Sequence, residues 1–274
     1  MKNVCSVHIH STMCDGKDPL SEMARAACEA GAVSFGASGH SHTEVPWDQG
    51  GVLPLDLTEY RDELLRLREA YAGRMEVLLG IEQDSLSPQS VPEWADYWIG
   101  SVHNLRRPEG FASVDYSPEK LEKDCRTMFR GDFLAMVEAY FGDVAAMAAR
   151  KPTILGHIDL IAKFNEDGHF FDEADPGYRA AALGALHGAD PKETLLEINT
   201  GAMSRGYRSA PYPALFLLRE WRAMGGKIIL TADAHSAETV VFGYDQAAEL
   251  ARAAGYERSV ILIRGGREER PLEF

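Results

Sequence analysis

Eight short apolar runs divide this chain, and amphipathic stretches fill most of the intervals between them. Short runs rich in Val, Ile and Leu indicate buried strands, whereas apolar residues spaced three and four apart indicate helices. The predicted strands are Val4–His10, Val33–Ser38, Glu76–Ile81, Tyr97–Val102, Thr153–Gly156, Leu195–Ile198, Lys227–Leu230 and Val260–Ile263. The predicted helices include Leu20–Ala30, Thr58–Tyr71, Pro118–Phe129, Phe133–Ala149, Ala214–Met224 and Asp245–Ala254.

Alternating strands and helices favour a mostly parallel sheet, because neighbouring parallel strands need a long crossover that a helix usually supplies. The chain has 274 residues, 45% of them hydrophobic, and its composition does not change abruptly along its length. We therefore predict a single domain over residues 1–274 of the α/β class. The expected fold is a distorted (β/α)7-type barrel with its active site at the C-terminal rim of the strands. An open doubly wound sheet is the second possibility.

Two long segments without a regular pattern, Ser41–Asp56 and Asn104–Ser117, each follow a predicted strand. Loops after the strands are where a barrel builds its active site, so we expect both segments to contribute to it. The charged run at 265–270 is predicted to be a polar tail.

Histidines and carboxylates recur where the predicted strands end. His8 and His10 are two residues apart on the first strand, so their side chains are expected on the same face. In a parallel barrel the C-terminal ends of the strands share one rim, where these side chains would gather. The predicted set is His8, His10, Asp15, His40, Glu82, His103, His157, Asp233 and His235.

This set is larger than one metal ion can use, because a single site takes three or four protein ligands plus water. We therefore predict two or three divalent ions, with at least one carboxylate shared between them. Nitrogen and oxygen ligands without thiolate favour zinc, manganese or iron over calcium or magnesium. Cys14 lies next to Asp15, and the carboxylate is the better candidate ligand.

The composition excludes several classes of function. Lysine and arginine total 28 against 42 acidic residues, and a net charge of −14 argues against a general nucleic-acid surface. A phosphorylated small molecule remains compatible, because bound metal ions reverse the local field. Four cysteines without paired spacing, no visible secretory signal and no apolar run of about 18 residues predict a soluble cytoplasmic protein.

The motifs around these residues resemble those of the polymerase and histidinol phosphatase (PHP) superfamily of metal-dependent phosphoesterases. The matching elements are His8-Ile9-His10, Cys14-Asp15-Gly16, Gly39-His40, Gly80-Ile81-Glu82, Gly100-Ser101-Val102-His103, Gly156-His157-Ile158-Asp159 and Ala232-Asp233-Ala234-His235. Three stretches further resemble the stand-alone histidinol-phosphate phosphatases of that superfamily: Ile99–His103, Gly156–Phe164 and Leu196–Gly201.

The resemblance implies a distorted barrel with three metals at its rim. Carried onto this chain, it implies three ligand groups. These are His8, His10, Glu82 and Asp233 for one ion; Glu82, His103 and His157 for the second; and Asp15, His40 and His235 for the third. The chain departs from many relatives at Gly39-His40-Ser41-His42, which lacks an acid before the histidine and has a second histidine after it. We favour His40 over His42 as the ligand there.

The resemblance also implies the reaction, hydrolysis of L-histidinol phosphate in histidine biosynthesis by a metal-bridging hydroxide, with Asp233 and His235 as catalytic residues. The leaving alcohol would take its proton from a metal-bound water or from an acid near these two residues. The phosphate needs a cationic partner, ideally a planar guanidinium. Arg205 after the sixth strand is the first candidate, Lys163 after the fifth is the second, and Arg208 is the third.

Two alternatives remain open at this point. One is a PHP phosphoesterase that acts on nucleotides or oligonucleotide ends. The other is a non-catalytic metal-binding module. The expected partner is a small phosphorylated metabolite, without nucleic acid or membrane, and the sequence does not predict an oligomeric state.

Overall fold

The structure is a computed structural model that describes residues 4–48 and 56–273. Its helices are α1 (Leu20–Glu29), α2 (Leu57–Ala70), α3 (Pro118–Met128), α4 (Phe133–Ala148), α5 (Pro176–His187), α6 (Gly201–Ser204), α7 (Leu215–Ala223) and α8 (Tyr244–Ala253). Its strands are β1 (Cys5–Ser6), β2 (Ser34–His40), β3 (Glu76–Asp84), β4 (Tyr97–Ser101), β5 (Asn104–Arg107), β6 (Gly110–Ser113), β7 (Ile154–Leu155), β8 (Leu195–Asn199), β9 (Lys227–Thr231), β10 (Arg258–Ile263) and β11 (Gly266–Pro271).

One curled sheet joins nine strands in the order β1-β2-β3-β4-β7-β8-β9-β10-β11, and only the β10–β11 pair is antiparallel. The chain after β9 returns to the chain after β1. There, Ile9 forms a parallel bridge with Ala234, and the N–H of His10 donates to the carbonyl of Ala234 at 2.9 Å. The seven strands from β1 to β9 in this order thus form a barrel-like ring joined at a short contact, and the predicted fold class is confirmed.

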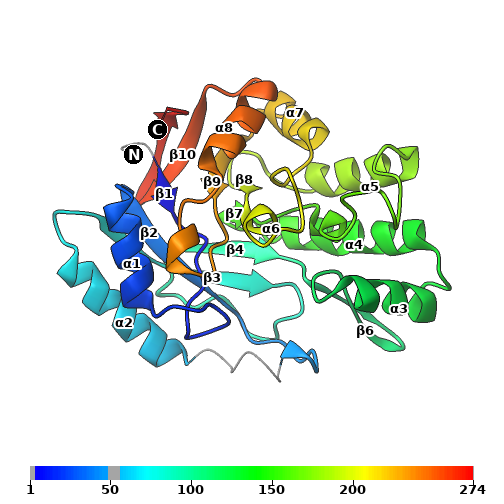
Figure 1. Cartoon of the computed structure of the whole chain (residues 1–274), viewed down its shortest axis with the longest axis horizontal. Coiled ribbons are helices and arrows are strands. Elements are labelled where there is room, and N and C mark those ends of the chain that lie inside the picture. Colours follow the sequence, from blue (N-terminus) through cyan, green and yellow to red (C-terminus); the bar gives the residue numbers. More distant parts are fainter. Residues whose placement is uncertain (1–3, 49–55, 274) are drawn as a thin grey trace.

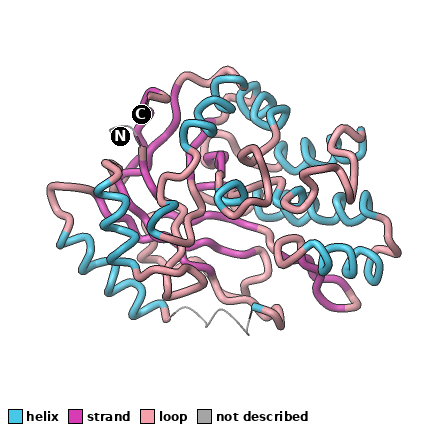
Figure 2. Tube along the Cα trace, viewed as in Figure 1, coloured by secondary structure: helices cyan, strands magenta, loops and turns pink. Residues whose placement is uncertain are grey.

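Helices lie around the outside of this curled sheet (Figure 1). In that view α1 and α2 lie at the left, α7 and α8 at the top, and α4 and α5 at the right. Figure 2 shows the same arrangement, with the strands enclosed by helices on these three sides. Within the described residues, each helix is too short or too polar to cross a lipid bilayer.

All eight predicted strands and all six named helices are present, with ends that differ by a few residues. Of the predicted strand Val4–His10, only Cys5–Ser6 is regular strand, because the chain bends at His8 before the isolated bridge at Ile9. The helix α5 was not predicted, although Asp175-Pro176 is a common helix start. The Asp175 carboxylate accepts hydrogen bonds from the N–H groups of Gly177 and Tyr178 at 2.6 and 3.3 Å.

Two predictions about irregular segments were wrong. Asn104–Ser117 contains the hairpin β5–β6, and Gly110, the first residue of β6 after the turn, has a positive φ of 135° that favours glycine. The predicted polar tail contains β11, which pairs along its length with β10. An edge strand with one partner carries charged side chains without penalty, so it lacks the apolar pattern of a buried strand. The other predicted irregular segment is Ser41–Asp56. Its part Ser41–Asp48 contains no α-helix or strand, and its residues 49–55 lie outside the described residues.

Alternation along each strand links the core of the barrel to its rim. On β3, Leu78, Gly80 and Glu82 are two residues apart and share the inward face. The ring of Tyr97 on β4 fills the space above Gly80, where a Cβ would lie 2.2 Å from its Cζ, and its hydroxyl donates to the carbonyl of Val7 at 2.5 Å. Apolar side chains therefore close the interior below the rim, and polar side chains occupy the same face at the strand ends.

Candidate metal centre

The structure brings all nine predicted ligands together at the C-terminal ends of the strands. They follow or end β1, β2, β3, β4, β7 and β9, so six strands and the Cys14–Gly16 turn contribute to one cluster. Apart from Asp15, His40, His103 and His235, these side chains are buried. The nine residues are His8, His10, Asp15, His40, Glu82, His103, His157, Asp233 and His235.

Glu82 occupies the middle of the cluster. Its Oε2 lies 3.4 Å from the Nε2 atoms of both His8 and His10, and 3.0 Å from Nδ1 of His40. Its Oε1 lies 3.3 Å from Nε2 of His103 and 3.1 Å from Nε2 of His157. A carboxylate that faces five imidazoles with both oxygens suits a ligand shared between ions, which is the role that the resemblance implies for this residue.

Asp15 and Asp233, the other two carboxylates among the predicted ligands, also contact histidines of the cluster. Oδ2 of Asp15 lies 3.2 Å from Nε2 of His235 and 3.5 Å from Nε2 of His40. Oδ1 of Asp233 lies 3.3 Å from Nε2 of His10 and 3.6 Å from Nδ1 of His235. The carboxylates and imidazoles thus alternate, which limits repulsion between like charges.

Four groups of side chains have ligand atoms within 4.8 Å of one another. The groups are His10, Asp15, His40 and His235; His8, His10 and Asp233; His8, Glu82 and His157; and His40, Glu82 and His103. The first group contains one complete set implied by the resemblance, Asp15, His40 and His235. The second contains His8, His10 and Asp233 without Glu82, and the other two place His157 and His103 separately with Glu82. The division of ligands among ions stays a prediction.

The unpartnered atoms of the cluster fit a divalent cation. Nε2 of His8, Nε2 of His10 and Oε2 of Glu82 are buried and lie close to one another, but none of them forms a hydrogen bond of suitable geometry with the described residues. Buried polar atoms without partners are costly and rare in native proteins. Lone pairs on two imidazoles and a carboxylate that converge in this way are the donor set of zinc and similar ions.

Glu197 on β8, for which no role was predicted, orients two of the ligands from the side away from the cluster centre. One oxygen accepts a hydrogen bond from Nδ1 of His8 at 2.5 Å and from the hydroxyl of Thr231 at 2.6 Å. The other accepts from the N–H of His157 at 2.7 Å. A carboxylate on the second ring nitrogen fixes a metal-binding histidine in the required tautomer. A glutamate inside the apolar run Leu195–Ile198 was the available signal in the sequence.

Asp84 acts on His103 in the same way. Its Oδ2 accepts a hydrogen bond from Nδ1 of His103 at 2.9 Å, which leaves Nε2 facing Glu82. Asp84 lies two residues beyond Glu82 on β3, so alternation places both carboxylates on the same face. Asp84 was not predicted to join the site, because the strand was expected to end at Ile81 and in fact continues to Asp84.

Asp233 has an unusual backbone that the neighbouring chain accommodates. Its φ is 46°, in the left-handed region that Asp tolerates better than most residues. Its carboxylate packs against Gly201, where a Cβ would lie 2.7 Å from Oδ2. The side-chain amide of Asn199 donates to the same oxygen at 3.4 Å. A residue without a side chain at position 201 therefore lets Asp233 point into the cluster.

Mutual charge controls the protonation of these groups in the metal-free chain. Burial disfavours the charged imidazole of His8, but Glu197, Glu82 and Asp233 outweigh it and raise its pKa to about 10. Burial likewise opposes charge on Asp233, while Arg205 and the nearby histidines hold its pKa well below the usual range. Asp233 therefore stays a carboxylate, which suits a ligand or a hydrogen-bond acceptor.

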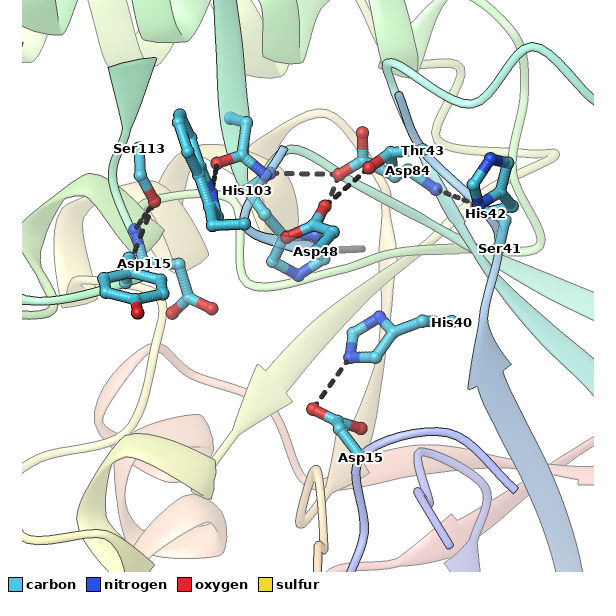
Figure 3. Close-up of a pocket in the computed structure, with 13 residues that line it drawn as sticks. Asp15, His40, Ser41, His42, Thr43, Asp48, Asp84, His103, Ser113 and Asp115 are labelled. Carbon is cyan, nitrogen blue, oxygen red and sulfur yellow. Dashed lines mark hydrogen bonds and ion pairs between the residues drawn. The ribbon is translucent and has the colours of Figure 1, made fainter. Parts of the chain in front are cut away.

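The second histidine of the β2 end, His42, lies outside all four ligand groups of the described residues. Figure 3 shows its ring turned away from His40 and Asp15. Cys14 has its Sγ 3.6 Å from Nδ1 of His10 and joins none of these groups either. The geometry thus favours His40 and Asp15 over these two residues, and their role as ligands stays a prediction.

The three candidate cations lie in different surroundings. Arg205 borders the cluster, with Nη2 3.2 Å from Oδ2 of Asp233 and Nη1 3.0 Å from Nδ1 of His235. Lys163 donates to the carbonyl of Asp115 at 3.0 Å and to its carboxylate. Arg208 is bound to the carboxylate of Glu173 at 2.9 Å and to a backbone carbonyl. Only Arg205 contacts the predicted ligands directly.

The sequence of this chain is similar to those of several known proteins. The PHP domain family matches residues 6–201. A protein of Deinococcus radiodurans described as a probable histidinol-phosphatase is 31% identical over 93% of this chain and 95% of its own length. The histidinol-phosphatase of Bacillus subtilis is 24% identical over 87% and 96% of the two chains.

A solved structure shares the fold. The histidinol phosphate phosphatase of Lactococcus lactis, in complex with zinc, L-histidinol and phosphate, matches with a TM-score of 0.68 and 18% identity. The match covers 97% of this chain and 99% of that chain. Taken with the strand-end cluster and the family match, these comparisons show that the chain belongs to the PHP domain family.

Proposed function

We propose that this protein is a metal-dependent phosphatase that hydrolyses L-histidinol phosphate to L-histidinol and phosphate in histidine biosynthesis. The observation that carries the proposal is the cluster of nine imidazole and carboxylate side chains around Glu82, bordered by the guanidinium of Arg205. The relatives described as histidinol-phosphatases, which align over most of the chain, support the choice of substrate.

The cluster would hold two or three divalent ions through the nine predicted ligands. We favour zinc among zinc, manganese and iron, because imidazole-rich sites without thiolate suit it and the related Lactococcus lactis structure contains it. Ions bound there lower the pKa of water and offset the negative charge of the phosphoryl oxygens during hydrolysis. Glu197 and Asp84 keep His8 and His103 oriented for this role.

Of the three candidate cations, Arg205 is the best placed to bind the phosphate. Its Nε is buried and has no hydrogen-bond partner among the described residues, and its Nη atoms lie at the edge of the cluster. A guanidinium binds two phosphate oxygens in a fixed geometry, which orients the phosphorus for in-line attack. Lys163 would add a second positive charge nearby, since Asp115 fixes its ammonium in place.

Asp233 and His235 remain the predicted catalytic residues. Because the pKa of Asp233 lies well below the usual range, its carboxylate would accept a hydrogen bond from the attacking water rather than protonate the leaving alcohol. Nδ1 of His235 lies 3.0 Å from Nη1 of Arg205, so the imidazole also orients the guanidinium.

The surroundings of the cluster disfavour the two alternatives. The pocket beside it is lined by four aspartates, Asp15, Asp48, Asp84 and Asp115, which repel a polyanionic oligonucleotide end. A non-catalytic module would tolerate the loss of ligands, whereas here all nine positions carry competent side chains. A cytoplasmic location and the single domain over residues 1–274 stay predictions.

The proposal is tested by the turnover of a panel of phosphate monoesters, nucleotides and diesters by the zinc-loaded protein. We expect L-histidinol phosphate to be the best substrate. Arg205→Ala should lower kcat/KM for it by about 100- to 1000-fold, because a guanidinium that stabilises phosphoryl charge contributes on this order. Elemental analysis must show the same metal content in the variant.

Arg66→Ala is the matched control, because Arg66 is an exposed arginine on α2 that pairs with Glu63. It should behave as the unchanged protein. Diester cleavage without turnover of L-histidinol phosphate would refute the proposed function. Full activity of metal-loaded Arg205→Ala would remove that residue from the phosphate site.

A further inference from the structure

A pocket of about 120 Å³ opens directly beside the metal centre. The predicted ligands Asp15, His40 and His103 form one part of its wall, and Trp47, Asp48 and Tyr116 form another. Figure 3 shows Asp48 and Asp115 near the same space as His40. A substrate whose phosphate lies on the metal centre would therefore place the rest of its alcohol in this pocket.

Asp48 differs from the other three aspartates of the pocket. Asp15 and Asp84 face histidines of the cluster, and Asp115 is paired with Lys163. Asp48 accepts a hydrogen bond from the hydroxyl of Thr43 at 2.5 Å, and it forms no ion pair with any residue in the described ranges. A carboxylate without a cationic partner in the wall of a pocket is a natural site for a ligand cation.

Two aromatic side chains, Trp47 and Tyr116, line the same pocket as Asp48, and the indole of Trp47 is held in place by neighbouring residues. The indole N–H of Trp47 donates to Oδ1 of Asn104 at 3.1 Å, and Nζ of Lys120 lies 3.7 Å from the centre of the indole. The ring of Tyr116 meets Trp47 edge to face, with 6.5 Å between centroids, and its residue is 62% exposed. An exposed aromatic ring held at the mouth of a pocket offers a surface for a planar ligand group.

We propose that Asp48 binds an ammonium group of the substrate alcohol, and that Trp47 and Tyr116 contact a planar nitrogen heterocycle on it. This assignment rests on the proposed function and specifies which residues would recognise the ammonium and the ring of the substrate. L-Histidinol phosphate carries an ammonium on the carbon next to the ester-bearing carbon and an imidazole one methylene further on. The predicted metal ligands, Asp48 and the two rings line one pocket, so each of these three substrate groups has a chemically suitable partner there.

The charges of the pocket add selectivity against other phosphates. A second anionic group on the alcohol would meet Asp48 and Asp84 instead of a cation, which disfavours sugar acids, nucleotides and diphosphates. Phosphate esters of neutral alcohols would leave the Asp48 carboxylate desolvated without a partner, which is also unfavourable. The preferred class is therefore the phosphate monoester of a cationic amino alcohol with a flat ring.

Asp48→Asn tests the ammonium site, because asparagine keeps an acceptor for Thr43 and removes only the charge. L-Histidinol phosphate is compared with its analogue that carries hydrogen in place of the ammonium, using the zinc-loaded protein. The ratio of the two kcat/KM values should fall by about 10- to 100-fold in the variant, the range of a hydrogen bond to a charged group. An unchanged ratio in the folded, metal-loaded variant would overturn the assignment.

Glu44→Gln is the matched control, because Glu44 is an exposed acid on the same segment that pairs with Arg106. It should keep the ratio of the unchanged protein. Tyr116→Ala tests the ring site with a variant whose exposed side chain is not needed for folding. It should lower the preference for L-histidinol phosphate over 2-aminoethyl phosphate, which lacks the ring, by about 2- to 10-fold.

The two levels of the proposal fail in different ways. If the unchanged protein prefers other phosphates to L-histidinol phosphate, the proposed function is wrong, and this assignment falls with it. If L-histidinol phosphate is preferred but Asp48→Asn leaves its ratio unchanged, the function stands and the ammonium site is wrong. If Tyr116→Ala leaves its ratio unchanged, the ring site is wrong.

Discussion

Glu197 shows how one buried residue organises several parts of this metal centre. Its two oxygens bind the ring of His8, the backbone of His157, the hydroxyl of Thr231 and the amide of Asn199. The carboxylate is wholly buried, so its charge is balanced by His8 and by these donors. Its position behind the ligands makes it a positioning residue, because it reaches the ions only through His8.

At the residue scale we predict that Glu197→Gln lowers metal content and activity together. Gln has nearly the same volume but lacks the negative charge that polarises the Nδ1–H of His8, so His8 becomes a weaker ligand. Metal affinity and kcat/KM for L-histidinol phosphate should each fall by about 10- to 100-fold. Elemental analysis after dialysis and steady-state kinetics at saturating zinc measure the two effects.

Glu193→Gln serves as the control, because Glu193 is an exposed acid just before the same strand. It should retain the metal content of the unchanged protein. Full metal content and normal kinetics in a folded Glu197→Gln protein would show that the hydrogen bond to His8 is not needed for the site.

At the scale of a single element, the connection from β8 to α6 positions both Asp233 and Arg205. Asn199 ends the strand, and its Oδ1 accepts a hydrogen bond from the N–H of Gly201 at 2.8 Å. This turn places Gly201 against the carboxylate of Asp233 and starts the short helix that leads to Arg205. One connection thus sets the position of a predicted ligand and of the predicted phosphate-binding residue.

We predict that Gly201→Ala displaces Asp233, because the added Cβ would lie 2.7 Å from Oδ2 and 2.8 Å from Cβ of Asp233. A shift of about 1 Å in a reacting group costs on the order of 100-fold in rate, so kcat should fall by about that factor. Metal content should fall as well, and circular dichroism should show an intact fold.

Gly142→Ala is the matched control on α4, where a Cβ meets no atom within 4 Å. Because alanine favours a helix interior, it should raise the free energy of unfolding by about 0.5–1 kcal/mol and leave metal content unchanged. If Gly201→Ala behaves in the same way, then close approach to Asp233 is not important.

At the scale of the whole molecule the metal centre joins the first and last parts of the barrel. The ligands span residues 8 to 235, and the contact between Ile9 and Ala234 lies between two of the strand ends that carry them. Without metal, the pKa of His8 and of His40 is raised to about 10. Burial opposes this shift, but the carboxylates around each ring outweigh it.

We predict that zinc loading at neutral pH releases about two or more protons, since His8 and His40 must be neutral to bind an ion. Calorimetric titration in buffers of different ionisation enthalpy measures this number. A heat of binding that is the same in all buffers would contradict it. His187→Gln, which changes an exposed histidine paired with Glu220, should release the same number of protons as the unchanged protein.

The same shifts predict how the metal-free protein responds to pH. A histidine with a raised pKa contributes stability that is complete below about pH 6.5 and is lost as pH rises towards about 10. Treatment with a chelator should therefore lower the unfolding temperature more at pH 9 than at pH 7. An equal effect at the two pH values would show that these imidazoles are not charged in the metal-free fold.

Much of the fold could be predicted because strands and helices of this chain have clear periodicities. Buried strands such as Glu76–Asp84 and helices such as Leu20–Glu29 follow from local apolar spacing alone. The hairpin of Asn104–Ser113 and the edge strand Gly266–Pro271 were missed, because exposed strands carry polar residues and their pairing depends on a partner strand.

The sequence alone determined the chemistry of the site, because histidines and carboxylates at the ends of successive strands can be read from the strand pattern. It did not determine which atoms face one another. The central position of Glu82, the support of His8 by Glu197 and the fit of Gly201 against Asp233 join residues up to about two hundred positions apart. Only the curvature of the sheet brings these strand ends together, and it depends on packing across the whole barrel rather than on any local pattern.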